Sequence, residues 1–274
     1  MRFHACTPGS PPAPPSLRTL FLQEYPLTQA FAVVSWGCAA TAWLAKILNS
    51  HPEIWCVHAL RSYWAILGQA ADLDDVTYMY VIASQGHAHK AAGDVHGIAR
   101  SSIPALHQVF GARFQAVVVV RAPEPRLGSL LALFARYQGH QSWDTRFARH
   151  LIATHRLRLP TGTYAEELFV HGVNMLNAVV EEQAVGTIYR CEDLTSNAEI
   201  LGQCIEEVTR GAVQPTRGWL QAAVQSGKIN LHRAETQPLS LTEWQLEILH
   251  KIVTPRAWEY YERLGYPLPA WHTP

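Results

Sequence analysis

The sequence predicts an α/β fold in which a central, mostly parallel sheet is flanked by helices. Short apolar runs rich in β-branched residues alternate with segments of helical periodicity, which is the pattern of strand and helix units in such folds. The run FQAVVVVR is apolar almost throughout, as expected of a parallel strand covered on both faces. The chain has 274 residues, 48% of them hydrophobic, which suffices for one well-packed core. We expect a single domain over 21–274, after a Pro-rich arm over 1–20 that cannot bury enough surface to order itself.

The first half of the chain begins with a predicted strand at 30–36, because AFAVVSW is apolar and rich in β-branched and aromatic residues. The small residues GCAA (37–40) then predict a tight loop. The next segment, 41–50, has helical spacing and stops before His51-Pro52. The remaining expected elements are a strand at 54–58, a helix at 60–70, a strand at 92–98 and a helix at 103–111.

The second half continues the alternation after the strand at 114–121. A helical pattern starts at Pro123 and runs to Tyr137, and the segment 139–184 is predicted to be a mostly helical insertion. The run VGTIYR (185–190) is the next buried strand. The expected helices after it are one that follows Glu192-Asp193-Leu194 and runs through Val208, and a long amphipathic helix over 241–264.

The charge balance argues against several classes of partner. The 22 Lys and Arg cancel the 22 Asp and Glu, and the pI is about 7.2, so nothing attracts the chain to nucleic acid or to an anionic membrane surface. The most apolar window, 30–48, contains Ser35, Gly37, Thr41 and Lys46, which argues against a transmembrane span. Prolines occupy the place of a signal-peptide core.

The five cysteines are widely spaced and form no CxxC pair, so neither a disulfide framework nor a zinc knuckle is indicated. The histidines show no HExxH spacing, and we expect no metal site. We expect a cytoplasmic protein that acts as a monomer or homodimer. Only four of the cationic side chains are lysines, so any catalytic lysine must be Lys46, Lys90, Lys228 or Lys251.

Two segments combine into a candidate anion site. A strand that leads through a small-residue loop into a helix presents backbone N–H groups and the positive end of the helix dipole to an anion, although Gly and Ala also serve close packing in such turns. The segment from Ser35 to Trp43 has this form. Directly after the strongest strand come Arg121, Pro123, Arg126 and Ser129, at the strand end where open α/β sheets bind ligands.

Together these segments resemble the sulfotransferases that use 3′-phosphoadenosine-5′-phosphosulfate (PAPS). The stretch SWGCAATAWLAKILNSHPEI is similar to that family's loop for the 5′-phosphosulfate, and Arg121-Ala122-Pro123 with Ser129 has the spacing of its 3′-phosphate motif. The run IYRCEDL and the ending YYERLGYP also look like this family. The resemblance implies that Arg121 and Ser129 bind the donor's 3′-phosphate. It implies that the loop residues bind the 5′ end: Gly37, Cys38, Ala39, Ala40, Thr41, Ala42 and Trp43.

The loop departs from the family pattern at three positions. Cys38 stands where the family has Lys or Arg, Ala39 where it has Ser, and Ala40 where it has Gly. The loop therefore lacks a cation beside the oxygen on which negative charge accumulates when the S–O bond breaks. The replacement candidates are Lys46, Lys90, Arg100 and an arginine from the later helices. The alternative is a loop that binds nucleotide without turning it over.

The general base is expected to be His96. An alcohol must lose its proton as it attacks sulfur, and histidine accepts protons near neutral pH. In the family this histidine ends a strand about two dozen residues before the arginine, and His96 follows a short strand and precedes Arg121 by 25 residues. A structural packing role is the alternative for His96, and His58 and His89 are the reserve candidates.

Further nucleotide contacts are carried over with less support from the residues themselves. Trp43 and Tyr189 are candidates for the adenine, with burial in the core as the other interpretation of Trp43. Arg233 is carried over as a nucleotide contact from the stretch GKINLHR, where a solvated loop is the competing interpretation.

The predicted function is sulfuryl transfer from PAPS to a hydroxyl or amine of a small-molecule acceptor, in the manner of natural-product tailoring. Two rivals stay open. One is a non-catalytic nucleotide-binding protein of the same fold, and the other is a P-loop-type small-molecule kinase, which needs GxxxxGK[ST] and a strand-end acid that this sequence lacks.

Overall fold

The computed structural model describes residues 28–35, 39–59, 74–96, 98, 100–137, 145–182, 186–227 and 239–272. Its centre is a five-stranded sheet with the strand order β2-β3-β1-β4-β5, and every neighbouring pair is parallel. The strands are β1 (Gln29–Val34), β2 (Ile54–His58), β3 (Ala91–Val95), β4 (Phe114–Val120) and β5 (Thr187–Arg190). The predicted α/β class with a parallel sheet is confirmed. The expected arm, 1–20, and the expected helix, 60–70, lie outside the described residues.

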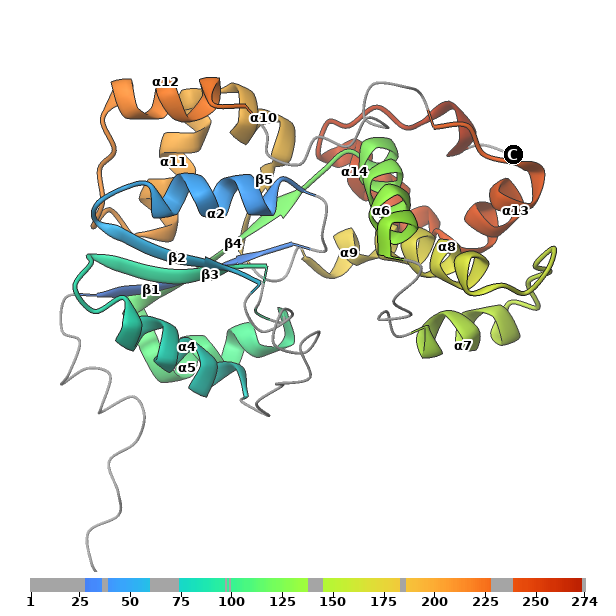
Figure 1. The fold of residues 1–274 in the computed structure, drawn as a ribbon, viewed down its shortest axis with the longest axis horizontal. Coiled ribbons are helices and arrows are strands. Elements are labelled where there is room, and N and C mark those ends of the chain that lie inside the picture. The colour runs from blue at the N-terminus through green and yellow to red at the C-terminus, as the bar shows by residue number, and fades with distance from the viewer. Residues whose placement is uncertain are drawn as a thin grey trace, which may run out of the picture.

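Helices cover both faces of the sheet (Figure 1). On one face lie α2 (Thr41–Asn49), α10 (Cys191–Ser196), α11 (Ala198–Val208) and α12 (Arg217–Gln225). On the other face lie α4 (Asp75–Gln85) and α5 (Ile103–Phe110).

A further group of helices packs beyond the carboxyl ends of the strands, at the right of Figure 1. Its members are α6 (Pro123–Tyr137), α7 (Arg146–Thr154), α8 (Tyr164–Asn174), α9 (Ala178–Glu182), α13 (Glu243–Ile252) and α14 (Pro255–Arg263). Short 3-10 helices complete the set: η1 (Arg100–Ser102), η2 (Gly111–Arg113), η4 (Met175–Asn177) and η6 (Ala270–His272). The described residues 145–182 are mostly helical.

The alternation of side chains along the strands builds the core on both faces. In β1, Phe31 and Val33 belong to the cluster beneath α2 and α11, while Ala32 and Val34 belong to the cluster on the α4 and α5 face. The four valines of β4 divide in the same way. A strand that is apolar on both faces therefore needs cover on both faces, which explains the continuous apolar runs in the sequence.

The predicted helix over 241–264 is wrong in one respect, because the structure divides it into α13 and α14. Pro255 stands at the first turn of α14 and lacks the N–H that a continuous helix would require. Thr254 adopts an extended conformation, and its side chain accepts a hydrogen bond from the Ala257 N–H. The helix α4 was not predicted at all, and Asp74 caps it by accepting from the N–H groups of Val76 and Thr77.

The strand order sets the place of the candidate site. The chain adds β2 and β3 on one side of β1, and then β4 and β5 on the other side, so the order reverses at β1. Ligands of open α/β sheets bind at the carboxyl ends of the strands where the order reverses. The segments that follow β1, β3 and β4 therefore lie at the edge where a ligand is expected.

Candidate functional site at the carboxyl edge of the sheet

The first turn of α2 lies at this edge, and its backbone N–H groups have no partner within the helix and receive no side-chain cap. Ala40 precedes the helix with a φ of 54°, in the left-handed region, and its side chain cannot cap the helix. No acidic residue stands in the first turn of α2. The N–H groups of that turn and the helix dipole are therefore available to an anion. Of the predicted loop residues, Ala39 is buried and Ala42 lies within α2, while Gly37 and Cys38 lie outside the described residues.

His96 follows β3, and its own backbone ties it to β1. Its N–H donates to the Val33 carbonyl at 2.9 Å, and its ring Nδ1 bonds the Ser35 carbonyl. A carbonyl oxygen only accepts, so Nδ1 must carry the proton, and the lone pair of the neutral ring is on Nε2. Its φ of 74° is rare for a residue other than Gly, and such strain is characteristic of functional positions.

The surroundings of His96 favour the neutral ring. Burial lowers its pKa below the ordinary histidine value, the hydrogen bond to Ser35 acts in the opposite direction, and the positive charge of Arg126 lowers the pKa further. A neutral imidazole with Nε2 unprotonated is the form of histidine that accepts a proton.

His58 lies next to His96 and contacts the start of α2. Its Nε2 is 3.1 Å from the Thr41 hydroxyl oxygen, and its ring stacks on the His96 ring with a centroid distance of 6.2 Å and an angle of 23°. Burial, with a smaller contribution from His96, lowers the pKa of His58 to about 4. The other reserve candidate, His89, precedes β3 and so lies at the opposite edge of the sheet.

The structure brings Arg121 and Ser129 together. Arg121 follows β4, Ser129 lies in α6, and the Arg121 Nη1 donates to the Ser129 hydroxyl at 2.8 Å. Both residues are almost completely buried, with 5% and 3% of their surface exposed. The spacing of eight residues places the Ser129 hydroxyl on the face of α6 that turns back toward the strand end. The Arg121 guanidinium and the Ser129 hydroxyl can therefore contact the same ligand group.

Arg126 is a buried cation of the same helix to which sequence reasoning assigned no role. Only 1% of its surface is exposed, and its Nη1 donates to the Tyr261 hydroxyl at 3.2 Å. The Tyr261 hydroxyl in turn donates to the Leu176 carbonyl. The effect of Arg126 on His96 shows that its charge reaches the candidate base. The available signal was its position three residues before Ser129, which puts the two side chains on one helix face.

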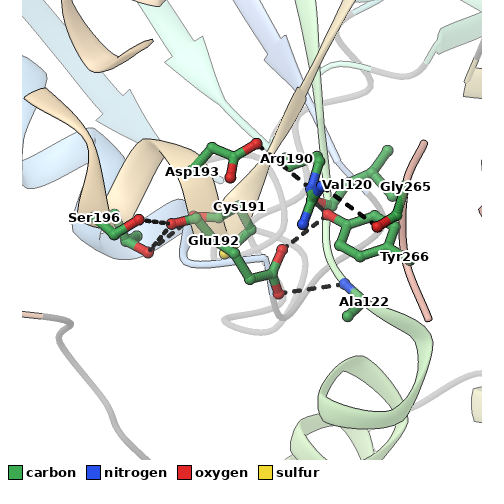
Figure 2. A network of polar contacts seen from close by, with 10 residues as sticks. Val120, Ala122, Arg190, Cys191, Glu192, Asp193, Ser196, Gly265 and Tyr266 are labelled. Atoms are coloured by element: carbon green, nitrogen blue, oxygen red, sulfur yellow. Dashed lines mark hydrogen bonds and ion pairs between the residues drawn. The ribbon is translucent and has the colours of Figure 1, made fainter. Parts of the chain in front are cut away.

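The strand end that carries Arg121 is fixed by a polar network from two distant segments (Figure 2). The Ala122 N–H donates to the Glu192 carboxylate at 3.3 Å, and the Tyr266 hydroxyl lies 2.8 Å from both the Val120 carbonyl and the Glu192 Oε2. The Arg190 guanidinium lies over the Tyr266 ring at 4.6 Å. The residues of IYRCEDL and of the ending YYERLGYP thus hold the peptide units on either side of Arg121.

Gly265 lets the chain turn out of α14 into this network. Its φ is +76°, a conformation that side chains rarely adopt, and a Cβ there would lie 3.2 Å from the Arg190 Nη1. The turn is therefore specific for glycine, and it places Tyr266 against β4.

Trp43 and Tyr189 lie on the sheet face covered by α2 and α11. Trp43 is buried in the core cluster of that face. Tyr189 packs against the same cluster, and its hydroxyl donates to the Glu207 carboxylate of α11 at 2.7 Å. Burial and the Glu207 carboxylate raise the pKa of Tyr189. Arg233 lies outside the described residues.

The two lysines expected as replacement cations lie away from the site. Lys46 is exposed in the last turn of α2, while the candidate anion site is at the first turn. Lys90 precedes β3 and forms an ion pair with Glu53, at the opposite edge of the sheet. Arg100 opens η1 just after His96 and is half-buried.

Other site types receive no support from the described ranges. They contain no group of three or more His, Cys, Asp or Glu side chains placed to hold a metal ion. No helix among the described residues is long and apolar enough to cross a membrane. Burial raises the pKa of the Cys56 and Cys204 thiols, which keeps both protonated.

Similarity to known proteins is found at the level of structure. No protein-family model matches the sequence, and no curated protein matches it. A solved structure of a sulfotransferase from Alicyclobacillus acidocaldarius is similar, with a TM-score of 0.45 and 12% identity, over 88% of this chain and 97% of that chain. The residues at the carboxyl edge, rather than this likeness, carry the functional argument.

Proposed function

We propose that this protein is a sulfotransferase that transfers the sulfuryl group of PAPS to a hydroxyl or amine of a small-molecule acceptor. The observation that carries the proposal is the meeting, at one edge of three adjacent strands, of an uncapped helix start, a buried Arg–Ser pair and a histidine whose lone pair is on Nε2. Such a site can bind two anionic groups and accept one proton.

The donor would be held at two points. The N–H groups at the start of α2 and the Thr41 hydroxyl suit the 5′-phosphosulfate, as do the predicted contacts Gly37, Cys38, Ala39, Ala40, Ala42 and Trp43. Arg121 and Ser129 suit the 3′-phosphate, because a buried guanidinium makes strong charge-assisted hydrogen bonds with phosphate oxygens. Tyr189 and Arg233 remain proposed nucleotide contacts.

His96 would act as the general base. Its Nε2 accepts the proton of the acceptor hydroxyl while the hydroxyl oxygen forms a bond to sulfur. The bond between sulfur and the bridging oxygen breaks, and its electron pair stays on the 5′-phosphate of the departing nucleotide, 3′-phosphoadenosine-5′-phosphate (PAP). The Ser35 carbonyl keeps Nδ1 protonated throughout and so orients Nε2.

Two competing functions, a P-loop-type kinase and a non-catalytic nucleotide-binding protein, require different residues at this site. The strongest strand ends in Arg121, where a kinase of the P-loop type needs an acid for Mg²⁺. The loop residues Cys38, Ala39 and Ala40 carry no charge, which favours a non-catalytic nucleotide-binding protein as the second candidate.

The test is an incubation of the protein with PAPS and a panel of phenols, alcohols and amines, with PAP and sulfonated product measured. Acceptor-dependent PAP release that is lost in Arg121→Met supports the proposal. Tight binding of PAP without turnover with any acceptor would favour the binding protein. ADP formation from ATP with Mg²⁺, in the absence of PAPS turnover, would favour the kinase.

A further inference from the structure

The loop proposed to bind the 5′-phosphosulfate has no cationic side chain of its own. From Trp36 to Trp43 the sequence reads WGCAATAW, and the nearest lysine in the chain, Lys46, is exposed in the last turn of α2. Breaking the bond between sulfur and the bridging oxygen adds negative charge to the 5′-phosphate, and such charge requires stabilisation in the transition state. The stabilising group must therefore come from another element.

Among the described residues, His58 is a basic side chain that contacts the helix start. Its Nε2 lies 3.1 Å from the hydroxyl oxygen of Thr41, the first residue of α2, and only 6% of the surface of Thr41 is exposed. The contact joins the end of β2 to the helix start across 17 residues of sequence. A hydroxyl accepts one hydrogen bond while donating another, so Thr41 can accept from His58 and donate to a phosphate oxygen.

His58 and His96 are held in different ways, which separates their tasks. His96 is fixed by the Ser35 carbonyl as the Nδ1-protonated ring, with its lone pair on Nε2. His58 faces a hydroxyl, which accepts a hydrogen bond from either a neutral or a protonated ring. A protonated His58 ring can therefore keep its contact with Thr41.

Strand β3 and helix α2 pack against β2, and the charged or titratable side chains described on or directly after them are His96, Asp94 and Lys46. His96, directly after β3, stacks on the His58 ring, whereas Asp94 of β3 points to the opposite face of the sheet, where Tyr78 of α4 donates a 2.6 Å hydrogen bond to it. From α2, Lys46 points to solvent. Arg126 acts on His96 from α6. Without donor, His58 is neutral at neutral pH because burial lowers its pKa to about 4, and a bound anion raises the pKa of a neighbouring histidine.

Building on the function proposed above, we propose that binding of the donor protonates His58, and that its imidazolium, through the Thr41 hydroxyl, supplies the positive charge that the loop lacks. The proton comes from water, one for each donor bound. It stays on His58 while the acceptor proton goes to His96, and it returns to water when PAP leaves. The charge is thus present only when an anion occupies the site.

Proton uptake can be measured directly by titrating the protein with PAP in a calorimeter, in pairs of buffers with different ionisation enthalpies. At pH 6 the wild-type protein should take up close to one proton more per PAP than His58→Gln. The phosphates of PAP also titrate near pH 6, but they contribute equally in both proteins and cancel in the difference. His87→Gln is the matched control, because His87 is exposed at the other edge of the sheet. It should behave as wild type.

The pH dependence of the PAP affinity also reports the proton uptake. Uptake of one proton makes PAP binding weaken by up to about tenfold per pH unit above the pKa of the free ring, and this slope should flatten in His58→Gln. Thr41→Val, which removes the hydroxyl and keeps the ring, should also reduce the uptake.

The outcomes separate this inference from the proposed function. Equal proton uptake in wild type and His58→Gln, with PAP still bound, would overturn the role of His58 and leave the donor site standing. Uptake that is lost in His96→Gln instead of His58→Gln would overturn it as well. Failure of PAP to bind the wild-type protein would refute the proposed function itself. If His58→Gln does not fold, ¹³C-labelled histidine in the wild-type protein must show the ring signal of His58 moving to the imidazolium position when PAP is added.

Discussion

The replacement of His96 by Asn tests the general base with little disturbance of the backbone. Asn tolerates the left-handed conformation that His96 adopts, with a φ of 74°, better than most residues. Its amide N–H can also donate to the Ser35 carbonyl, which the His96 Nδ1 contacts. The variant therefore removes the Nε2 lone pair and keeps the local fold.

The expected fall in kcat equals the general-base assistance that the His96 Nε2 supplies. General-base assistance contributes about 10²- to 10⁴-fold, or about 3 to 5 kcal/mol of the barrier, and His96→Asn should lower kcat by this range. Binding of PAP should be nearly intact. The loss should be larger for an alcohol acceptor than for 4-nitrophenol, because an acidic phenol needs less help to lose its proton.

The pH profile gives a second readout from the same assay of PAP release. Burial lowers the pKa of His96, and the neutral ring is the active form, so activity should persist below the ordinary histidine range and be lost as the pH falls through the lowered pKa. His96→Asn should abolish this acid limb. A variant that keeps more than about a third of the wild-type rate, or an acid limb unchanged by the substitution, would refute the assignment.

Two further predictions concern stability. Tyr266→Phe removes the hydroxyl that contacts the Val120 carbonyl and Glu192, so the free energy of unfolding in urea should fall by about 1 to 3 kcal/mol. The control Tyr260→Phe should change it little. Equal effects of the two substitutions would contradict the role of the network. Ala40→Gly relieves the left-handed strain and should keep or raise the free energy of unfolding by up to about 1 kcal/mol, whereas Ala42→Gly, within α2, should lower it by about 1 kcal/mol. If Ala40→Gly lowered the free energy of unfolding as much as Ala42→Gly, the inference of backbone strain at Ala40 would be contradicted.

The parallel sheet could be predicted because its signals are local. Continuous apolar runs such as the one ending at Val120 are what strands covered on both faces require. The division between α13 and α14 was missed because the amphipathic pattern continues across Pro255, although a proline at the first turn starts a new helix. The helix α4 was missed because its apolar residues make a weak stripe, and Asp74 was its best available signal.

At the candidate site, the spacing of Arg121 and Ser129 could be predicted to bring them together, because both belong to one strand and the helix that follows it. The contact between His58 and Thr41 could not, since it depends on which strands become neighbours in the sheet. The same holds for Arg126, whose partner Tyr261 is 135 residues away. The network around Glu192 and Tyr266 shows how the segments IYRCEDL and YYERLGYP contact the strand end that carries Arg121.

The central claim, that this edge of the sheet binds a donor with a 3′-phosphate, is tested most directly by binding alone. Wild-type protein and Arg121→Met are each titrated with PAP and with 5′-AMP, which lacks the 3′-phosphate, and the folding of both proteins is checked. Loss of the buried guanidinium should weaken PAP binding by about 2 to 4 kcal/mol, roughly 30- to 1,000-fold, and should leave 5′-AMP binding nearly unchanged. Equal affinity of the wild-type protein for the two nucleotides, or an undiminished affinity of folded Arg121→Met for PAP, would contradict the account.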